Sequence, residues 1–198
     1  MPSSAGSWAG RANLGAVTWS IAGSLTVVPA LDRPDLLAEP VAGALAGLDA
    51  TRVGVAEIDP DLADTAEFCA HYGSPLAASA NCVVILGKRG DTETMAACLV
   101  LATTRADVNG LARRHLGVRK ASFAPMDRAV EQSGMAYGGI TPIGLPADWP
   151  LLVDAAVAAA PELVIGSGVR GSKLLVPGDL LAGLSSAEVV EGLGRPVG

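Results

Sequence analysis

Two apolar runs joined by a short turn constrain the fold of this chain more than any other feature. Residues 81–86 read Asn-Cys-Val-Val-Ile-Leu, residues 88–91 read Lys-Arg-Gly-Asp, and residues 95–102 form a second apolar run. Runs of this kind on both sides of a glycine-containing turn are typical of a β-hairpin. A hairpin near the middle of the chain argues against a fold in which strands and helices strictly alternate.

Other segments with strand or helix patterns surround this hairpin. We expect strands at 25–28, 52–58, 118–123, 151–153, 163–165 and 173–176. We expect helices at 40–48, from Pro60 to the stop at Gly73, from a capping box at Thr104 and Asp107 to Gly117, at 125–132, and after a cap formed by Ser185 and Glu188. Hairpins interspersed with helices predict an α+β fold with a mixed, strongly curved, barrel-like β-sheet and flanking helices.

The chain is long enough, and apolar enough, to form one domain with its own core. Half of its 198 residues are apolar and 17% are charged, and no repeat or long linker divides it. We expect a flexible Ser/Gly-rich tail over residues 1–22 and a single domain over 23–198. The apolar stretch 16–30 is interrupted by Gly23 and is too short to cross a bilayer, so no membrane association is expected.

Charge and cysteine content limit the classes of partner and compartment. The net charge of -6 disfavours attraction to a polyphosphate over the whole surface. Cys69, Cys82 and Cys98 are an odd number of cysteines without CxxC spacing, which is typical of free thiols in the cytoplasm. His71 and His115 lie far apart in the sequence and belong to no ligand-spaced cluster. We therefore expect neither a metal nor a cofactor.

A glycine-rich segment, Gly166-Ser167-Gly168-Val169-Arg170-Gly171, matches the GxGxxG pattern of dinucleotide sites. That fingerprint requires a helix to begin directly after it, whereas residues 172–176 have a strand pattern. The segment is also consistent with a connection between two strands, or with a wall of small residues that a ligand approaches closely. A nucleotide-binding regulator therefore stays open as one interpretation.

The segment from Tyr137 to Pro146 combines glycine and proline so densely that it can be neither helix nor regular strand. Gly138 and Gly139 allow close approach to a ligand, and Pro142 stiffens the bend. Adjacent amide groups in such a bend can point together at an oxygen that becomes negative during a reaction. A purely structural Ω-loop is equally consistent with these residues.

Basic side chains concentrate in one region of the sequence. This region is either an ordinary solvated surface or a footprint for a nucleic-acid backbone, which needs only a few such contacts. Its members are Lys88, Arg89, Arg105, Arg113, Arg114, Arg119 and Lys120.

The order of several motifs between residues 48 and 184 is similar to that of a known family. The motifs are Thr-Ala-Glu at 65–67 with a helix to Gly73, the strand 81–85, Gly-Gly-Ile-Thr-Pro-Ile-Gly at 138–144 as a GxxxP loop, Val153-Asp154, Gly-Ser-Gly at 166–168 and Pro-Gly-Asp-Leu-Leu at 177–181. In this order they resemble the YbaK-like and prolyl-tRNA-synthetase-associated editing domains, which are aminoacyl-tRNA deacylases.

The resemblance implies an enzyme that hydrolyses the ester between an incorrect amino acid and the 3′-terminal ribose of tRNA. It implies no cofactor, and it implies the acceptor end of mischarged tRNA as partner, with a synthetase as a further candidate. By resemblance, Gly138, Gly139, Ile140, Thr141, Pro142 and Gly144 hold the aminoacyl group, Gly166, Ser167 and Gly168 line the opposite wall, and Asn81 contacts the terminal nucleotide. Candidates for contact with the tRNA backbone are Lys88, Arg114, Arg119 and Lys120.

One departure from the family pattern concerns charge. Many members carry a lysine directly before the position of Asn81, and this chain has Ala80 there. Lys88 and Arg119 are the candidates to replace that charge. Because the chain contains neither a GxSxG elbow nor a plausible catalytic triad, hydrolysis would proceed by substrate positioning and oxyanion stabilisation, with a ribose hydroxyl helping to activate water. The alternative is a non-catalytic module that binds aminoacyl-tRNA or a synthetase.

Overall fold

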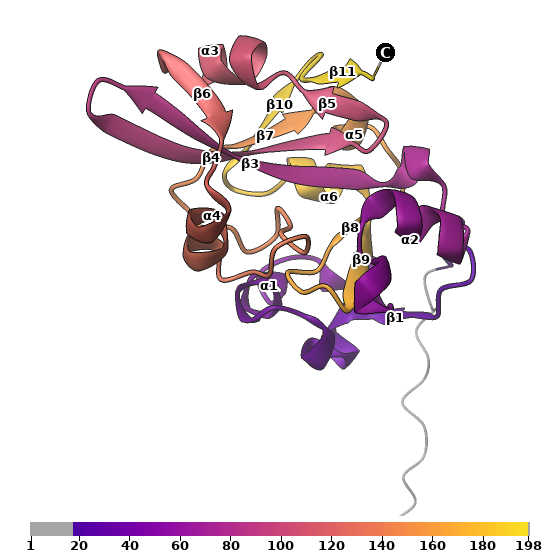
Figure 1. The fold of residues 1–198 in the computed structure, drawn as a ribbon. Helices are drawn as coiled ribbons and strands as arrows, with labels where there is room; N and C mark the ends of the chain where they lie inside the picture. Colours follow the sequence, from indigo (N-terminus) through magenta and orange to yellow (C-terminus); the bar gives the residue numbers. More distant parts are fainter. Residues whose placement is uncertain (1–17, 198) are drawn as a thin grey trace, which may run out of the picture.

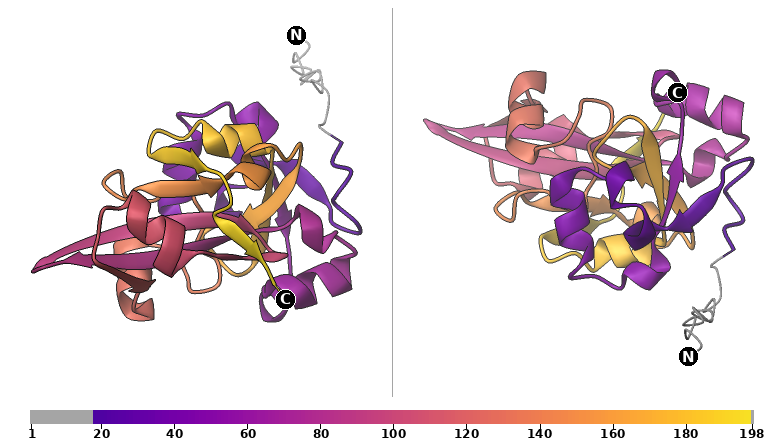
Figure 2. Two further views of the ribbon diagram at one scale, coloured as in Figure 1. Left: turned by 90° about the horizontal axis from the view of Figure 1, so that it is seen from above. Right: turned by 90° about the horizontal axis from the view of Figure 1, so that it is seen from below.

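The predicted hairpin forms the centre of the larger of two main β-sheets. The computed structural model describes residues 18–197 of the chain. In it, β3 (Ala80–Arg89) and β4 (Thr92–Leu101) pair in antiparallel fashion along their whole length. The tip of this hairpin projects from the rest of the molecule (Figures 1 and 2). The sequence prediction of a hairpin is therefore confirmed.

Three shorter strands complete this five-stranded sheet, and two further sheets accompany it. The five-stranded sheet has the order β10 (Ala187–Val190), β7 (Leu151–Asp154), β4, β3, β6 (Lys120–Phe123). The second sheet has the order β1 (Val27–Pro29), β2 (Gly54–Glu57), β9 (Ser172–Val176), β8 (Leu163–Gly166). A two-stranded sheet pairs β5 (Thr104–Ala106) with β11 (Gly194–Pro196).

The helices are short and lie around these sheets (Figure 1). They are α1 (Glu39–Leu45), α2 (Thr65–Tyr72), α3 (Arg113–His115), α4 (Met126–Ser133), α5 (Ala155–Ala158) and α6 (Gly178–Ala182). The α+β class is confirmed. The barrel-like shape that we predicted is not confirmed. Within residues 18–197 both main sheets are open, because neither closes on itself.

The largest apolar cluster joins the two main sheets. It contains Val55 of β2, Leu99 of β4, Val153 of β7 and Leu174 of β9, none of which is accessible to solvent. Burial of such aliphatic side chains is the main favourable contribution to folding. At their near edges the sheets are joined by a parallel bridge between Ser79 and Val164. Both residues line the cavity described below.

The helix predicted from Pro60 to Gly73 is divided in two. Asp59 caps a short 3₁₀ turn at Pro60–Leu62 by accepting from the amide of Asp61 at 2.9 Å, and α2 begins only at Thr65. Gly73 ends α2 in the left-handed conformation, as predicted. Because of this division, the carbonyl of Ala63 accepts no hydrogen bond within a helix. It accepts one from the side chain of Lys173 instead.

Two predicted helix caps are wrong because longer-range pairing overrides the local signal. Thr104 belongs to β5, and Asp107 is itself the N-cap, accepting from the amides of Gly110 and Leu111. Ser185 and Glu188 cap no helix, since residues 187–190 form β10 and pair in parallel with β7. Valine-rich residues fit such a pleated, half-buried position.

Only the last five residues of the predicted N-terminal tail, 18–22, belong to the part of the chain that the structure describes. Residues 1–17 lie outside the described part of the chain. From residue 18 onward the chain is packed: Ile21 is buried, and the amide and hydroxyl of Ser20 donate to Glu162 at 2.9 and 2.7 Å. Packed structure thus begins before residue 23. No helix within residues 18–197 is long and apolar enough to cross a membrane.

Candidate functional site

A cavity of about 510 Å³ lies between the edge of β3 and the edge of β8. The register pairs β6 with β3 only from Ile85 onward, and the amide of Ala124 donates to the carbonyl of Val84, so the stretch from Ala80 to Val83 lacks a strand partner on that side. The start of α2, the side of α4 and the loop after α4 enclose the space. In Figure 1 α2 and α4 lie on the same side of the hairpin, separated along its length. The lining residues that the argument uses are Asp64, Thr65, Asn81, Gly138, Ile140 and Lys173.

Two amide groups of the glycine–proline loop have no hydrogen-bond acceptor among the described residues. The amide of Gly139 donates to the carbonyl of Ala136 at 2.9 Å, and that of Thr141 lies 3.4 Å from the sulfur of Met135. Within residues 18–197, by contrast, no acceptor is placed for the amides of Gly138 and Ile140. These two residues line the cavity, whereas their neighbours Gly139 and Thr141 are buried behind it. Along residues 138–141, amides that bind acceptors within the protein therefore alternate with amides that have none.

The connection between β8 and β9 holds this loop in place. The amide of Gly168 donates to the carbonyl of Gly139, and the amide of Ala136 donates to the carbonyl of Gly168, both at 2.8 Å. A Cβ atom at Gly166 would overlap the carbonyl oxygen of Gly139. The two glycine-rich segments thus pack backbone to backbone, which only glycine permits at this separation.

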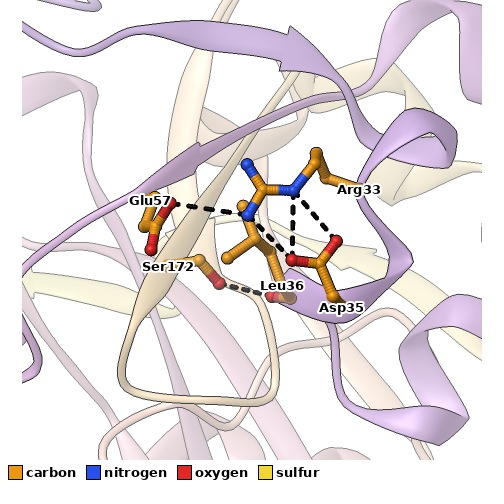
Figure 3. Close-up of polar contacts among 5 residues, drawn as sticks. All are labelled: Arg33, Asp35, Leu36, Glu57 and Ser172. Atoms are coloured by element: carbon orange, nitrogen blue, oxygen red, sulfur yellow. Dashed lines mark hydrogen bonds and ion pairs between the residues drawn. The ribbon is translucent and has the colours of Figure 1, made fainter.

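The GxGxxG segment is a connection between two antiparallel strands, and β9 rather than a helix follows it. The strand-connection interpretation is confirmed, and the helix that a dinucleotide fingerprint requires is not present at residues 172–176. Ser167 is fully buried, with its hydroxyl 2.7 Å from that of Ser172. Ser172 in turn donates to the carbonyl of Leu36 (Figure 3). The hydroxyl of Ser167 therefore fixes this connection instead of facing the cavity.

An ion-pair cluster fixes the segment before α1 to the second sheet. The guanidinium of Arg33 donates to the carboxylate of Asp35 through Nε at 2.9 Å and Nη2 at 2.7 Å, and it reaches Glu57 of β2 at 3.4 Å (Figure 3). These hydrogen bonds lower the pKa of Asp35. The cluster holds the segment that contains Leu36, whose carbonyl accepts the hydrogen bond from Ser172 at the end of the β8–β9 connection.

Asn81 occupies the cavity wall with its amide nitrogen available. The hydroxyl of Thr65, at the start of α2, donates to Oδ1 of Asn81 at 2.9 Å. This bond orients the side-chain amide so that its NH₂ group can serve as a donor. Ala80, directly before it, lines the cavity without any charge.

Lys173 and Asp64 are charged cavity-lining residues that the sequence prediction missed, and Lys173 is the buried one of the two. Lys173 is 7% exposed, and its Nζ donates to the carbonyl of Ala63 at 2.7 Å and lies 5.4 Å from the ring centre of Phe68. Burial, and then the nearby charge of Arg170, lower its pKa. The available signal was a single lysine in the strand Ser-Lys-Leu-Leu-Val, whose residues are all buried.

The remaining predicted loop residues support the site from behind. Thr141 and Pro142 are buried, and Gly144 packs so closely on α1 that a Cβ atom would overlap the carbonyl of Pro40. Of the predicted aminoacyl and nucleotide contacts, the residues that line the cavity are Gly138, Ile140, Asn81 and Gly166.

The predicted tRNA-backbone residues lie outside the cavity. Lys88 faces Lys120 across the β3–β6 pair and forms an ion pair with Glu93 at 2.7 Å. The amide of Arg119 donates to the carbonyl of Lys88 at 2.9 Å, and Arg114 belongs to α3. The strand β6 connects this basic region, at Lys120, to the cavity at Phe123, a distance of roughly 10 Å along an extended chain.

Three exposed apolar side chains surround the mouth of the cavity. Phe123, Met126 and Tyr137 line it and are 69%, 56% and 63% exposed. Isolated exposed apolar residues are ordinary, but a group of them at a cavity mouth is characteristic of a binding surface.

Cys82 lines the cavity and is partly buried, whereas Cys98 and Asp154 are buried in the fold. The three cysteines are free thiols, and burial raises the pKa values of Cys82 and Cys98. Asp154 caps α5 by accepting from the amide of Ala156 at 2.9 Å and binds the amide of Gly194 at 2.6 Å. Among residues 18–197 no group of three or more His, Cys, Asp or Glu side chains is arranged to hold a metal.

Comparison with solved structures shows the same fold elsewhere. The crystal structure of a candidate trans-editing enzyme for prolyl-tRNA synthetase superposes with a TM-score of 0.67, 23% identity, and coverage of 80% of this chain and 96% of that one. The crystal structure of a hypothetical protein superposes with a TM-score of 0.68, 19% identity, and coverage of 79% and 100%.

A family comparison agrees with the resemblance seen in the motifs. The family model described as the aminoacyl-tRNA editing domain matches residues 59–184, which include α2, the β3–β4 hairpin, the glycine–proline loop and the β8–β9 connection. The matched segment covers well over half of the chain and contains every cavity-lining residue. This chain belongs to the aminoacyl-tRNA editing domain family.

Proposed function

We propose that this protein is a free-standing deacylase that hydrolyses the ester of mischarged tRNA in trans. The observation that carries the proposal is the pair of free amides at Gly138 and Ile140, two residues that line a cavity of about 510 Å³. Membership of an aminoacyl-tRNA editing family supplies the substrate class.

The surroundings of the cavity suit the 3′ end of a tRNA. The exposed rings of Phe123 and Tyr137 at the mouth offer surfaces on which a terminal base can stack. Lys120, the first residue of β6, and Arg119, directly before it, can contact backbone phosphates. The amide of Asn81, oriented by Thr65, can donate to the terminal nucleotide. The tRNA end would therefore enter the cavity past the exposed side chains of Phe123, Met126 and Tyr137, which form its rim, and reach the glycine–proline loop.

The proposed chemistry is hydrolysis by positioning. A water oxygen attacks the ester carbonyl carbon, and the carbonyl oxygen becomes negative while it accepts hydrogen bonds from the amides of Gly138 and Ile140. The bond to the ribose oxygen then breaks, releasing the amino acid and a tRNA with a free 3′-terminal ribose. The neighbouring ribose hydroxyl orients the water and relays its proton to the departing ribose oxygen, which leaves as a hydroxyl group.

The usual energetic contributions of oxyanion donors and of substrate positioning are large enough to account for hydrolysis by this mechanism. One preorganised oxyanion donor contributes about 3 kcal/mol to transition-state stabilisation, and positioning of the reactants contributes up to roughly 7–11 kcal/mol. An aminoacyl ester is already labile, so these contributions suffice without a protein nucleophile. The burial that raises the pKa values of Cys82 and Cys98 disfavours their thiolates as nucleophiles.

The test is release of amino acid from a panel of mischarged tRNAs incubated with the full chain. We expect at least one of them to be deacylated faster than its spontaneous hydrolysis, with multiple turnovers per protein molecule. Binding of the same tRNAs is measured in parallel. If the protein binds them but accelerates none, the non-catalytic module is the correct interpretation and the deacylase proposal is wrong.

A further inference from the structure

Lys173 is a buried cation without a carboxylate partner. Among the described residues no carboxylate lies within ion-pair distance of its Nζ, and the carbonyl of Ala63 satisfies only one of its three donors. The nearest acidic residue in the cavity, Asp64, has an exposed side chain that pairs with Arg170 at 3.5 Å. Burying an uncompensated charge is costly, so an anion that enters the cavity would stabilise the charged form of Lys173.

The polar groups near Lys173 are mainly hydrogen-bond donors. Asn81 presents its NH₂ group to the same cavity, because Thr65 already donates to its oxygen. Arg170 adds a second positive charge at the side where Gly138 lies, since a Cβ atom on Gly138 would overlap its guanidinium. This combination favours an oxygen anion over a cation or a neutral group.

We propose that Lys173 is a positioning residue that binds an anionic oxygen group of the substrate in this cavity. The identification of that substrate as aminoacyl-tRNA rests on the proposed function. Two parts of aminoacyl-tRNA carry the required chemistry: the phosphate of the terminal nucleotide, and the carboxylate of an acidic amino acid. Lys88 and Arg119 lie outside the cavity, so they do not supply this contact.

The first arm of the test measures binding without hydrolysis. Isothermal titration calorimetry compares adenosine 5′-monophosphate with adenosine, using wild type and Lys173→Met. If the phosphate is the anion, wild type binds the monophosphate more tightly, and the substitution removes this preference, a loss of about ten- to a hundredfold in affinity for a charge-assisted hydrogen bond. The matched control is Arg52→Met, which removes a positive charge that pairs with Asp179 away from the cavity and leaves the preference intact.

The second arm uses tRNA charged with aspartate or with asparagine. If the side-chain carboxylate is the anion, wild type deacylates the aspartyl ester in preference to the asparaginyl ester through a lower KM, and Lys173→Met abolishes this preference. Thermal melting establishes that each variant is folded. Lys173→Gln, whose amide keeps a donor for the carbonyl of Ala63, replaces the methionine variant if that one does not fold.

The proposal is overturned if wild type itself shows neither preference, or if every preference that wild type shows persists unchanged in a folded Lys173 variant. The calorimetric arm needs no turnover, so failure of the deacylase proposal is distinguishable from failure of this one. An inactive protein that still binds the monophosphate through Lys173 would sustain the anion site alone.

Discussion

The substitution Gly138→Ala separates the catalytic role of the loop from its structural role. Gly138 has φ +79°, a backbone conformation that costs an L-residue about 1–2 kcal/mol. For a domain of this size that cost lowers Tm by about 2–8 °C. The new methyl group overlaps only the flexible end of Arg170, so the rest of the fold can adjust. At the cavity, however, the methyl group and the displaced guanidinium disturb the amide that faces the substrate, and loss of one oxyanion donor lowers kcat by about 10²–10³-fold.

Gly117→Ala is the matched control for this variant. Gly117 has φ +63°, and a Cβ atom there would meet no other atom within 4 Å, so the backbone strain is similar and the cavity is untouched. Thermal melts and single-turnover deacylation are measured for both variants. We expect similar losses of stability and a large loss of rate only for Gly138→Ala. If the two variants deacylate at rates within about threefold of each other, the loop amide does not stabilise the transition state.

Three further predictions concern the core and the charged surface of the domain. Phe68→Ala removes a ring that is 1% exposed and should cost about 3–5 kcal/mol in chemical denaturation; a cost below about 1 kcal/mol would contradict its role in the core. Glu93 lies 2.7 Å from both Lys88 and Arg128, which lower its pKa, so its stabilising effect is present above its unfolded pKa and is lost as pH falls through the folded value. Glu93→Gln should therefore lower the denaturation midpoint near neutral pH but not in acid, and an equal difference at both would refute the ion-pair explanation. Burial raises the pKa of Cys98 to about 12, so a thiol reagent near neutral pH should modify it only after unfolding; rapid modification of native protein would show that it is accessible.

Local patterns in the sequence predict the parts of the fold that local chemistry decides. The β3–β4 hairpin follows from two apolar runs around Gly90, which adopts a positive φ in the turn. The loop after α4 follows from its glycine and proline content. The stop of α2 at Gly73 follows from the preference of glycine for the left-handed conformation.

Features that depend on distant parts of the chain could not be predicted in this way. The β10 strand forms because residues 187–190 pair with the free edge of β7, and no local pattern indicates that partner. The placement of Lys173 and Asn81 around one cavity depends on the approach of two separate sheets. Which amides of the glycine–proline loop are free also depends on its contacts with Ala136 and Met135.

The most direct test of the oxyanion site is a crystal structure with a non-hydrolysable analogue, an aminoacyl group joined through an amide to the 3′ position of adenosine. We predict that its carbonyl oxygen lies about 3 Å from the amide nitrogens of Gly138 and Ile140, with the adenine against the rim at Phe123 and Tyr137. A bound analogue whose carbonyl points away from both amides, or that binds outside this cavity, would contradict the proposed mechanism.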